Sequence, residues 1–140
     1  FSNLVSAQKL LYRMVPPSRK LGNNSGRSGG YSKPNRSKDY YANLNDRYVG
    51  VNALAYNKFK TLEVRLHSGT TDYVKIVSFI LILEAIVAKT DEVKRAATTV
   101  PGFIKQFGIP SELGNYIEAR VNKFASSHDT NDTSAEDVTS

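Results

Sequence analysis

The segment TLEVRLHSGT, residues 61–70, carries three side chains at alternate positions that could do chemistry. Glu63, Arg65 and His67 are two residues apart, so a strand through this segment places them on one face. A glutamate carboxylate is a hard oxygen ligand for a divalent cation, and an arginine guanidinium binds phosphate or carboxylate in a bidentate manner. The alternative interpretation is that this row is the solvated side of an antiparallel sheet, with the alternating apolar residues on the inner face.

A second candidate is the segment VPPSRK, residues 15–20. Arg19 follows two prolines and precedes a glycine-rich stretch, so a rigid turn could present it to an anionic group. The same residues also fit a helix end followed by surface charge. The glycines of residues 22–30 match neither the Gly-x-x-x-x-Gly-Lys-Ser/Thr order of a phosphate-binding loop nor the Gly-x-Gly-x-x-Gly fingerprint of dinucleotide-binding folds.

Composition limits the chemistry that this chain can perform. Its 140 residues, 40% hydrophobic and 23% charged, are typical of one globular domain. The absence of cysteine excludes disulfides and thiolate metal sites. With two histidines, one of them in a polar tail, the usual zinc sites and a Ser-His-Asp triad are not supported.

Positive charge is concentrated in the first part of the chain. Residues 1–60 contain eleven Lys and Arg against two acids, whereas residues 61–140 contain eight against eleven acids. A strongly basic segment of this kind commonly binds phosphate groups, so nucleic acid is a possible partner through residues 9–60. A solvated basic loop explains the same composition equally well.

Hydrophobic periodicity and helix-breaking residues predict an α+β fold. Residues 1–14 have a helical apolar stripe that the following prolines end, and residues 20–39 form a basic Gly/Ser-rich flexible loop. Residues 47–67 read as an antiparallel hairpin whose strands, 47–56 and 61–67, are joined by the polar turn NKFK.

The second half of the chain is predicted to be helical. Gly69 is free to adopt a positive φ, and the Thr-Thr-Asp sequence from Thr70 supplies N-cap candidates for a helix over 72–89. This helix is apolar nearly all round, which predicts that it is buried between the sheet and other helices. Three further helices are expected, at 91–97, 100–107 and 111–126. A disordered acidic tail is expected after them, at 127–140. The domain is thus expected to span 1–126.

No membrane span is expected, because Lys75, Ser78 and Glu84 interrupt the most apolar window. The N-terminus lacks the basic segment and apolar run of a signal peptide. Because the chain starts at Phe1 rather than Met, we expect a processed product or a piece of a longer polypeptide. A cytoplasmic location is expected, or association with a virion.

Four separated motifs resemble the C-terminal half of the amidoligase family, which is related to glutamine synthetase and glutamate–cysteine ligase. They are, in order, Pro16-Pro17-Ser18-Arg19, Arg47-Tyr48 with Asn52, Thr61-Leu62-Glu63-Val64-Arg65, and Gly69-Thr70 before an apolar helix. The similarity covers about residues 12–90, and the family occurs in phages, plasmids, bacteria and fungi.

The resemblance implies a partial glutamine-synthetase-like domain and ATP-dependent joining of a carboxylate to an amine through an acyl phosphate, with magnesium as cofactor. By that analogy Glu63 is a magnesium ligand, while Arg65 and Arg19 are catalytic and hold the transferring phosphoryl group or the carboxylate. Residues expected to bind substrate or phosphate are Arg47, Asn52, Gly69 and Thr70. The loop at 20–39 would lie near the site as a lid.

One departure from the family pattern is large. The Gly-x-Glu-x-Glu and Gly-x-His-x-His strands that supply most of the family's metal ligands are not in these 140 residues. The chain therefore needs a missing N-terminal half, or another chain, to complete such a site. The alternatives are a non-catalytic structural or interaction protein that reuses the fold, for example a phage virion component, and a basic nucleic-acid-binding protein.

Overall fold

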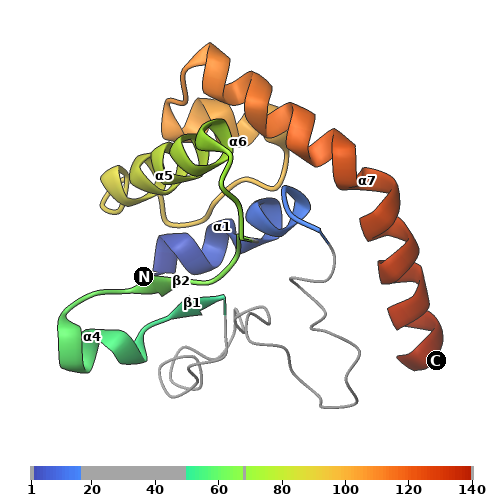
Figure 1. Ribbon diagram of the computed structural model, residues 1–140, viewed down its shortest axis with the longest axis horizontal. Coiled ribbons are helices and arrows are strands. Elements are labelled where there is room, and N and C mark those ends of the chain that lie inside the picture. Colours follow the sequence, from blue (N-terminus) through green and yellow to red (C-terminus); the bar gives the residue numbers. More distant parts are fainter. Residues whose placement is uncertain (1, 17–49, 68, 140) are drawn as a thin grey trace.

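The computed structural model describes residues 2–16, 50–67 and 69–139 (Figure 1). Within these ranges the chain is mixed: several helices accompany one small two-stranded antiparallel sheet. Arg19, Arg47, the predicted loop at 20–39 and the start of the predicted hairpin lie outside the described residues. The α+β class is thus confirmed in outline.

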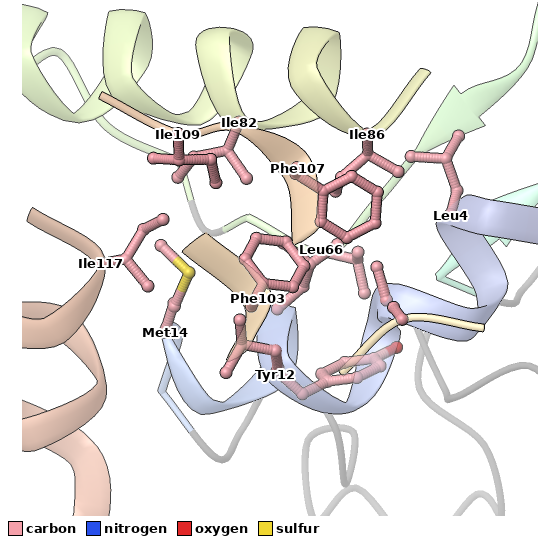
Figure 2. Packing of buried hydrophobic residues seen from close by; sticks show 14 of the residues in the cluster. Leu4, Tyr12, Met14, Leu66, Ile82, Ile86, Phe103, Phe107, Ile109 and Ile117 are labelled. Carbon is pink, nitrogen blue, oxygen red and sulfur yellow. The ribbon is translucent and has the colours of Figure 1, made fainter. Parts of the chain in front are cut away.

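Four helices form the body of the molecule. Helix α1 (Ser2–Arg13) contacts both α5 (Tyr73–Ala88) and α7 (Ser111–Thr139), and α6 (Val100–Phe107) packs against α7. The apolar stripe predicted for the first helix is confirmed, since its leucines face the core. Figure 2 shows how the buried cluster draws on all of these helices, with Phe103 and Phe107 between Met14 on one side and Ile86 on the other.

The sheet is much smaller than the predicted hairpin. Strand β1 (Val51–Asn52) pairs antiparallel with β2 (Glu63–Val64), with Val51 opposite Val64 and Asn52 opposite Glu63. The predicted polar turn is wrong, because the connection contains the short helix α4 (Leu54–Phe59). The N-cap residue of α4 is Ala53, and the Asn52 side chain before it accepts the Leu54 N–H at 3.0 Å. Lys60 ends the helix in the left-handed conformation at φ 58°.

The predicted helix over 72–89 is present as α5, and Asp72 is its N-cap. The Asp72 Oδ1 accepts the N–H groups of Val74 at 2.9 Å and Lys75 at 3.3 Å. Its predicted burial is wrong. Ile82 and Ile86 are buried against the core, whereas most of the other large apolar residues of α5 face solvent. The helix is apolar all round, but the described elements cover only one of its sides.

Residues 91–97 are a turn and an irregular stretch rather than the predicted helix. Side chains satisfy their backbone groups instead of an intrahelical ladder. The Ser6 hydroxyl accepts the Ala96 N–H, and the Gln106 amide accepts the Ala97 N–H and donates to the Arg95 carbonyl. Because these partners come from α1 and α6, this local structure depends on tertiary contacts.

Helix α6 spans the predicted residues 100–107, with Pro101 in its first turn. The structure adds Thr99 as its N-cap and Gly108, at φ 60°, as the residue that closes it. Helix α7 begins at Ser111 as expected, but it continues to Thr139 through the segment predicted to be disordered. No glycine or proline follows Gly114, so no helix breaker stops it. Figure 1 shows its last turns extending beyond the helical body.

Among the described residues, no helix has the length and apolar character needed to cross a membrane.

Candidate functional site

The row of polar residues on the small sheet is the strongest candidate site. Asn52 on β1 lies opposite Glu63 on β2, and its amide Nδ2 donates a hydrogen bond to Glu63 Oε2 at 3.0 Å. The other carboxylate oxygen, Oε1, lies 2.9 Å from Arg65 Nε. Three residues that the sequence analysis singled out therefore form one connected cluster, which we call the Asn52–Glu63–Arg65 row.

The row is shielded to different degrees along its length. The side chain of Arg65 is 24% exposed and that of Glu63 is 46% exposed. The Arg65 Nε is itself shielded from solvent, and the Arg65 backbone N–H donates to the Gly50 carbonyl at 2.7 Å. The guanidinium is thus held in place by backbone pairing and by its acidic neighbour, while the carboxylate remains accessible to solvent.

The opposite side of the sheet anchors the row to the helical core. Val51 and Leu66 are fully buried, and Figure 2 shows Leu66 among the aromatic and aliphatic side chains of the cluster. Gly50, next to Val51, sits tightly against α1. A Cβ at this position would lie 2.6 Å from the Tyr12 hydroxyl oxygen and 2.7 Å from Leu66 Cδ2. The absence of a side chain at Gly50 therefore lets the sheet approach α1.

His67 is not grouped with Glu63 and Arg65 as the alternation of the segment predicts. The strand pairing ends at Val64, and the His67 ring lies against Phe79 of α5, with ring centroids 4.8 Å apart and the planes tilted by 58°. Half-buried between the sheet and α5, His67 contributes packing where these two elements meet.

Thr70 and Gly69, predicted to bind substrate or phosphate, lie in the connection between β2 and α5. The Thr70 hydroxyl accepts the Asp72 N–H at 3.1 Å, which positions the residue that caps α5. A Cβ at Gly69 would meet nothing within 4 Å, so no close packing requires a glycine there. Thr70 thus has a local backbone role, and the predicted role of both residues in binding stays a prediction.

The row offers one carboxylate to a metal ion. Within the described ranges, no group of three or more His, Asp or Glu side chains converges on a point. Magnesium is commonly bound through one or two carboxylates together with phosphate oxygens and water, so Glu63 fits as a single ligand and not as a complete site. A cation bound there would compete with Arg65 and Asn52 for the carboxylate oxygens.

Sequence reasoning missed a buried cation at the far end of α1. Arg120 of α7 is 8% exposed, its Nε donates to the Met14 carbonyl at 3.1 Å, and its guanidinium lies over the Phe124 ring at 4.9 Å. A cation at a helix C-terminus is favoured by the helix dipole. Arg120 lies three residues after Ile117 and four before Phe124, so helical spacing places it on the apolar side of α7, whereas Lys123 is exposed. Its partner could not be read from the sequence, because the Met14 carbonyl is distant along the chain.

Tyr116 lies one helical turn before Arg120. Burial raises the pKa of its phenol above 10.0, and the charge of Asp72 acts in the same direction, while the positive charge of Arg120 acts against it. The net upward direction shows that loss of solvent is the larger effect.

Comparisons with models of protein families, with curated proteins and with solved structures find no match to this chain. The amidoligase resemblance therefore rests on the motifs in the sequence alone.

Proposed function

We propose that this chain is part of an ATP-dependent carboxylate–amine ligase of the amidoligase type. The observation that carries the proposal is the Asn52–Glu63–Arg65 row, in which a solvent-accessible carboxylate stands 2.9 Å from a largely shielded arginine on an antiparallel sheet. The motifs of the sequence analysis independently assigned functional roles to these same residues.

The residues of the row have separate tasks in the proposed reaction. ATP transfers its γ-phosphoryl group to a substrate carboxylate, and the amine then attacks the acyl phosphate and displaces inorganic phosphate. Arg65 holds the negative charge of the transferring phosphoryl group or of the carboxylate, because its planar fork matches those oxygens. Glu63 would supply one oxygen ligand to magnesium, which would neutralise phosphate charge when bound. Asn52 holds the Glu63 carboxylate in position through its amide.

The proposal includes a second polypeptide segment that completes the site. The described sheet has two strands of two residues each, and isolated pairs of this length are marginal in water. The row has one carboxylate, whereas phosphoryl transfer on ATP needs magnesium held by several oxygen ligands. Both observations support further strands and acids contributed by a missing N-terminal half or by another chain.

The test measures ADP release by the chain assembled with the polypeptide that carries the remaining strands. Turnover should require magnesium, a carboxylate and an amine together. Glu63→Gln and Arg65→Gln should each lower kcat by about a hundredfold or more, since each removes a charge from the reacting centre. The matched controls are Glu118→Gln on the exposed side of α7 and Arg95→Gln in the irregular stretch before α6, which should keep full turnover.

Unchanged turnover in Glu63→Gln would contradict the metal-ligand role. ATP consumption that does not depend on the carboxylate and the amine would contradict the ligase assignment itself.

A non-catalytic interaction protein is the second candidate function, favoured by a different observation. Exposed apolar residues cover the outer side of α5, which is the kind of surface that binds another protein. Recovery of the chain in fixed stoichiometry within a larger particle, with neither nucleotide nor magnesium bound, would favour this candidate over the ligase.

Nucleic-acid binding is the third candidate, and α4 is the described element that favours it. Tyr56 and Phe59 are exposed, and the ammonium groups of Lys60 and Lys58 lie 5.1 Å from their respective ring centroids. Aromatic rings beside basic groups suit single-stranded nucleic acid. Affinity for an oligonucleotide should then fall steeply with salt, and an affinity indifferent to salt would exclude this candidate.

A further inference from the structure

The two charged side chains of the Asn52–Glu63–Arg65 row are paired with each other. Glu63 Oε1 lies 2.9 Å from Arg65 Nε, and Glu63 Oε2 accepts a hydrogen bond from the Asn52 amide at 3.0 Å. Each carboxylate oxygen therefore already has a partner within the chain. A cation that approaches Glu63 competes with Arg65, and an anion that approaches Arg65 competes with Glu63.

The strength of this competition depends on how far water screens the two charges. The ion pair between Lys89, at the C-cap of α5, and Glu92 provides a comparison at 3.1 Å. Each of its side chains is more exposed than the matching side chain of the Glu63–Arg65 pair. Charges that are partly shielded from water interact more strongly than charges at a solvated surface. We therefore expect Glu63 and Arg65 to influence each other's ligands more than Lys89 and Glu92 do.

The charge balance of the row selects the kind of ligand that it accepts. Its one carboxylate and one guanidinium cancel. A divalent cation alone adds positive charge beside Arg65, and a phosphoryl dianion alone adds negative charge beside Glu63. Both additions are unfavourable in a partly shielded place. When the two ions enter together they leave the row neutral, whereas a divalent cation with a single carboxylate leaves one positive charge unbalanced.

We propose that the row binds a divalent cation and a phosphoryl dianion together as one unit, and that it binds either ion alone weakly. Glu63 holds the cation and Arg65 holds the phosphoryl oxygens, so each ion weakens the internal pair that opposes the other. Because it uses these two roles, this inference rests on the proposed function. It adds that Arg65 holds the phosphoryl group rather than the substrate carboxylate.

The coupling between the two ions is reciprocal. If the cation raises the affinity for the anion, the anion must raise the affinity for the cation by the same factor. We expect a factor of about ten, which lies within the usual range for coupled sites. Reciprocity provides two separate measurements of this one quantity.

The test is a titration of the 140-residue chain, labelled with nitrogen-15, that is followed by nuclear magnetic resonance. The probes are magnesium chloride and methyl phosphate at constant ionic strength and about pH 7, where a phosphate monoester carries close to two negative charges. The side-chain Nε–H resonance of Arg65 and the backbone N–H resonance of Glu63 report binding. Saturating magnesium should lower the dissociation constant of methyl phosphate about tenfold, after correction for the complex that the two ions form in solution.

Glu63→Gln distinguishes coupled binding from two independent sites. Without magnesium, this variant should bind methyl phosphate about tenfold more tightly than the parent does, because the charge that opposes the anion is gone. Magnesium should no longer raise that affinity. Arg65→Gln should bind magnesium equally well with and without methyl phosphate. Glu92→Gln is the matched control from the exposed ion pair, and it should keep the coupling of the parent.

Acetate in place of methyl phosphate tests which anion the row selects. Because acetate carries one negative charge, magnesium should raise its affinity by less than about threefold. Equal coupling for the two anions would contradict the choice of the phosphoryl group.

The proposal would be overturned by a dissociation constant for methyl phosphate that is the same with and without magnesium. Failure of the two ions to bind together, or an affinity for methyl phosphate that Glu63→Gln leaves unchanged, would also overturn it. These results would not decide the ligase assignment, because the ADP-release assay of the assembled protein requires a carboxylate and an amine that the titration does not contain. Coupled binding in a protein that shows no such turnover would support this inference and contradict the ligase.

Discussion

Asn52 and Glu63 face each other across the two-stranded sheet, and the Asn52 amide Nδ2 donates to Glu63 Oε2 at 3.0 Å. The same Asn52 accepts the Leu54 N–H through its Oδ1. One side chain thus orients the candidate metal-binding carboxylate and bonds to the first residue of α4. The local backbone and the candidate site are therefore coupled through Asn52.

Asn52→Asp replaces the donor of this pair with a second carboxylate while keeping the acceptor for Leu54. Like charges directly opposite on an antiparallel pair are unfavourable, so we expect a loss of about 1 kcal/mol in the free energy of unfolding. Magnesium should recover part of the loss, because two adjacent carboxylates are ligands for this ion. Urea unfolding with and without magnesium measures both effects. Asn57→Asp on the exposed side of α4 is the control, and an equal loss there would contradict the explanation.

Gly50→Ala should destabilise the protein by about 1–3 kcal/mol, because the new methyl group overlaps the Tyr12 hydroxyl and Leu66 Cδ2. The substitution should cost less in a Tyr12→Phe background, where the nearest overlapping atom is absent. Thermal unfolding of the four proteins of this double-mutant cycle measures the coupling, and strictly additive effects would contradict it.

Leu66→Ala should lower the free energy of unfolding by about 2–5 kcal/mol, because Leu66 is fully buried where the sheet meets the helical core. Leu62→Ala provides the matched control four residues earlier in the same segment. Leu62 is 37% exposed, so its truncation should cost less than about 1 kcal/mol. Similar losses for the two leucines, measured by denaturant unfolding, would contradict the burial of this segment.

Stability should fall at high pH partly through Tyr116. Burial raises the pKa of this phenol in the folded protein above its value in the unfolded chain. The unfolded chain therefore loses the phenolic proton first as the pH rises. The stability that the protonated Tyr116 contributes below pH 10 is then lost as the pH rises through the folded pKa. Tyr116→Phe should show a shallower decline in melting temperature above pH 10 than the parent. A parallel decline in both proteins would show that Tyr116 contributes nothing to it.

The ends of several helices could be read from the sequence because they depend on neighbouring residues. Asp72 caps α5 through the N–H groups two and three residues later, and Thr99 and Gly108 bound α6. The polar row was likewise predictable from the spacing of Glu63 and Arg65, since residues two apart on a strand share a face. These features depend only on residues that lie within one or two helical turns along the sequence.

Tertiary structure alone decided the features that depend on distant partners. The sequence predicted a strand up to residue 56, but the strand ends at Asn52, whose amide bonds to Glu63 across the sheet, and helix α4 begins at Leu54. It predicted a helix at 91–97, where Ser6 and Gln106 instead bind the backbone. It also predicted a buried α5, because hydropathy records how apolar a helix is and not how many neighbours surround it. The described elements pack against one side of α5, so most of its other large apolar residues face solvent.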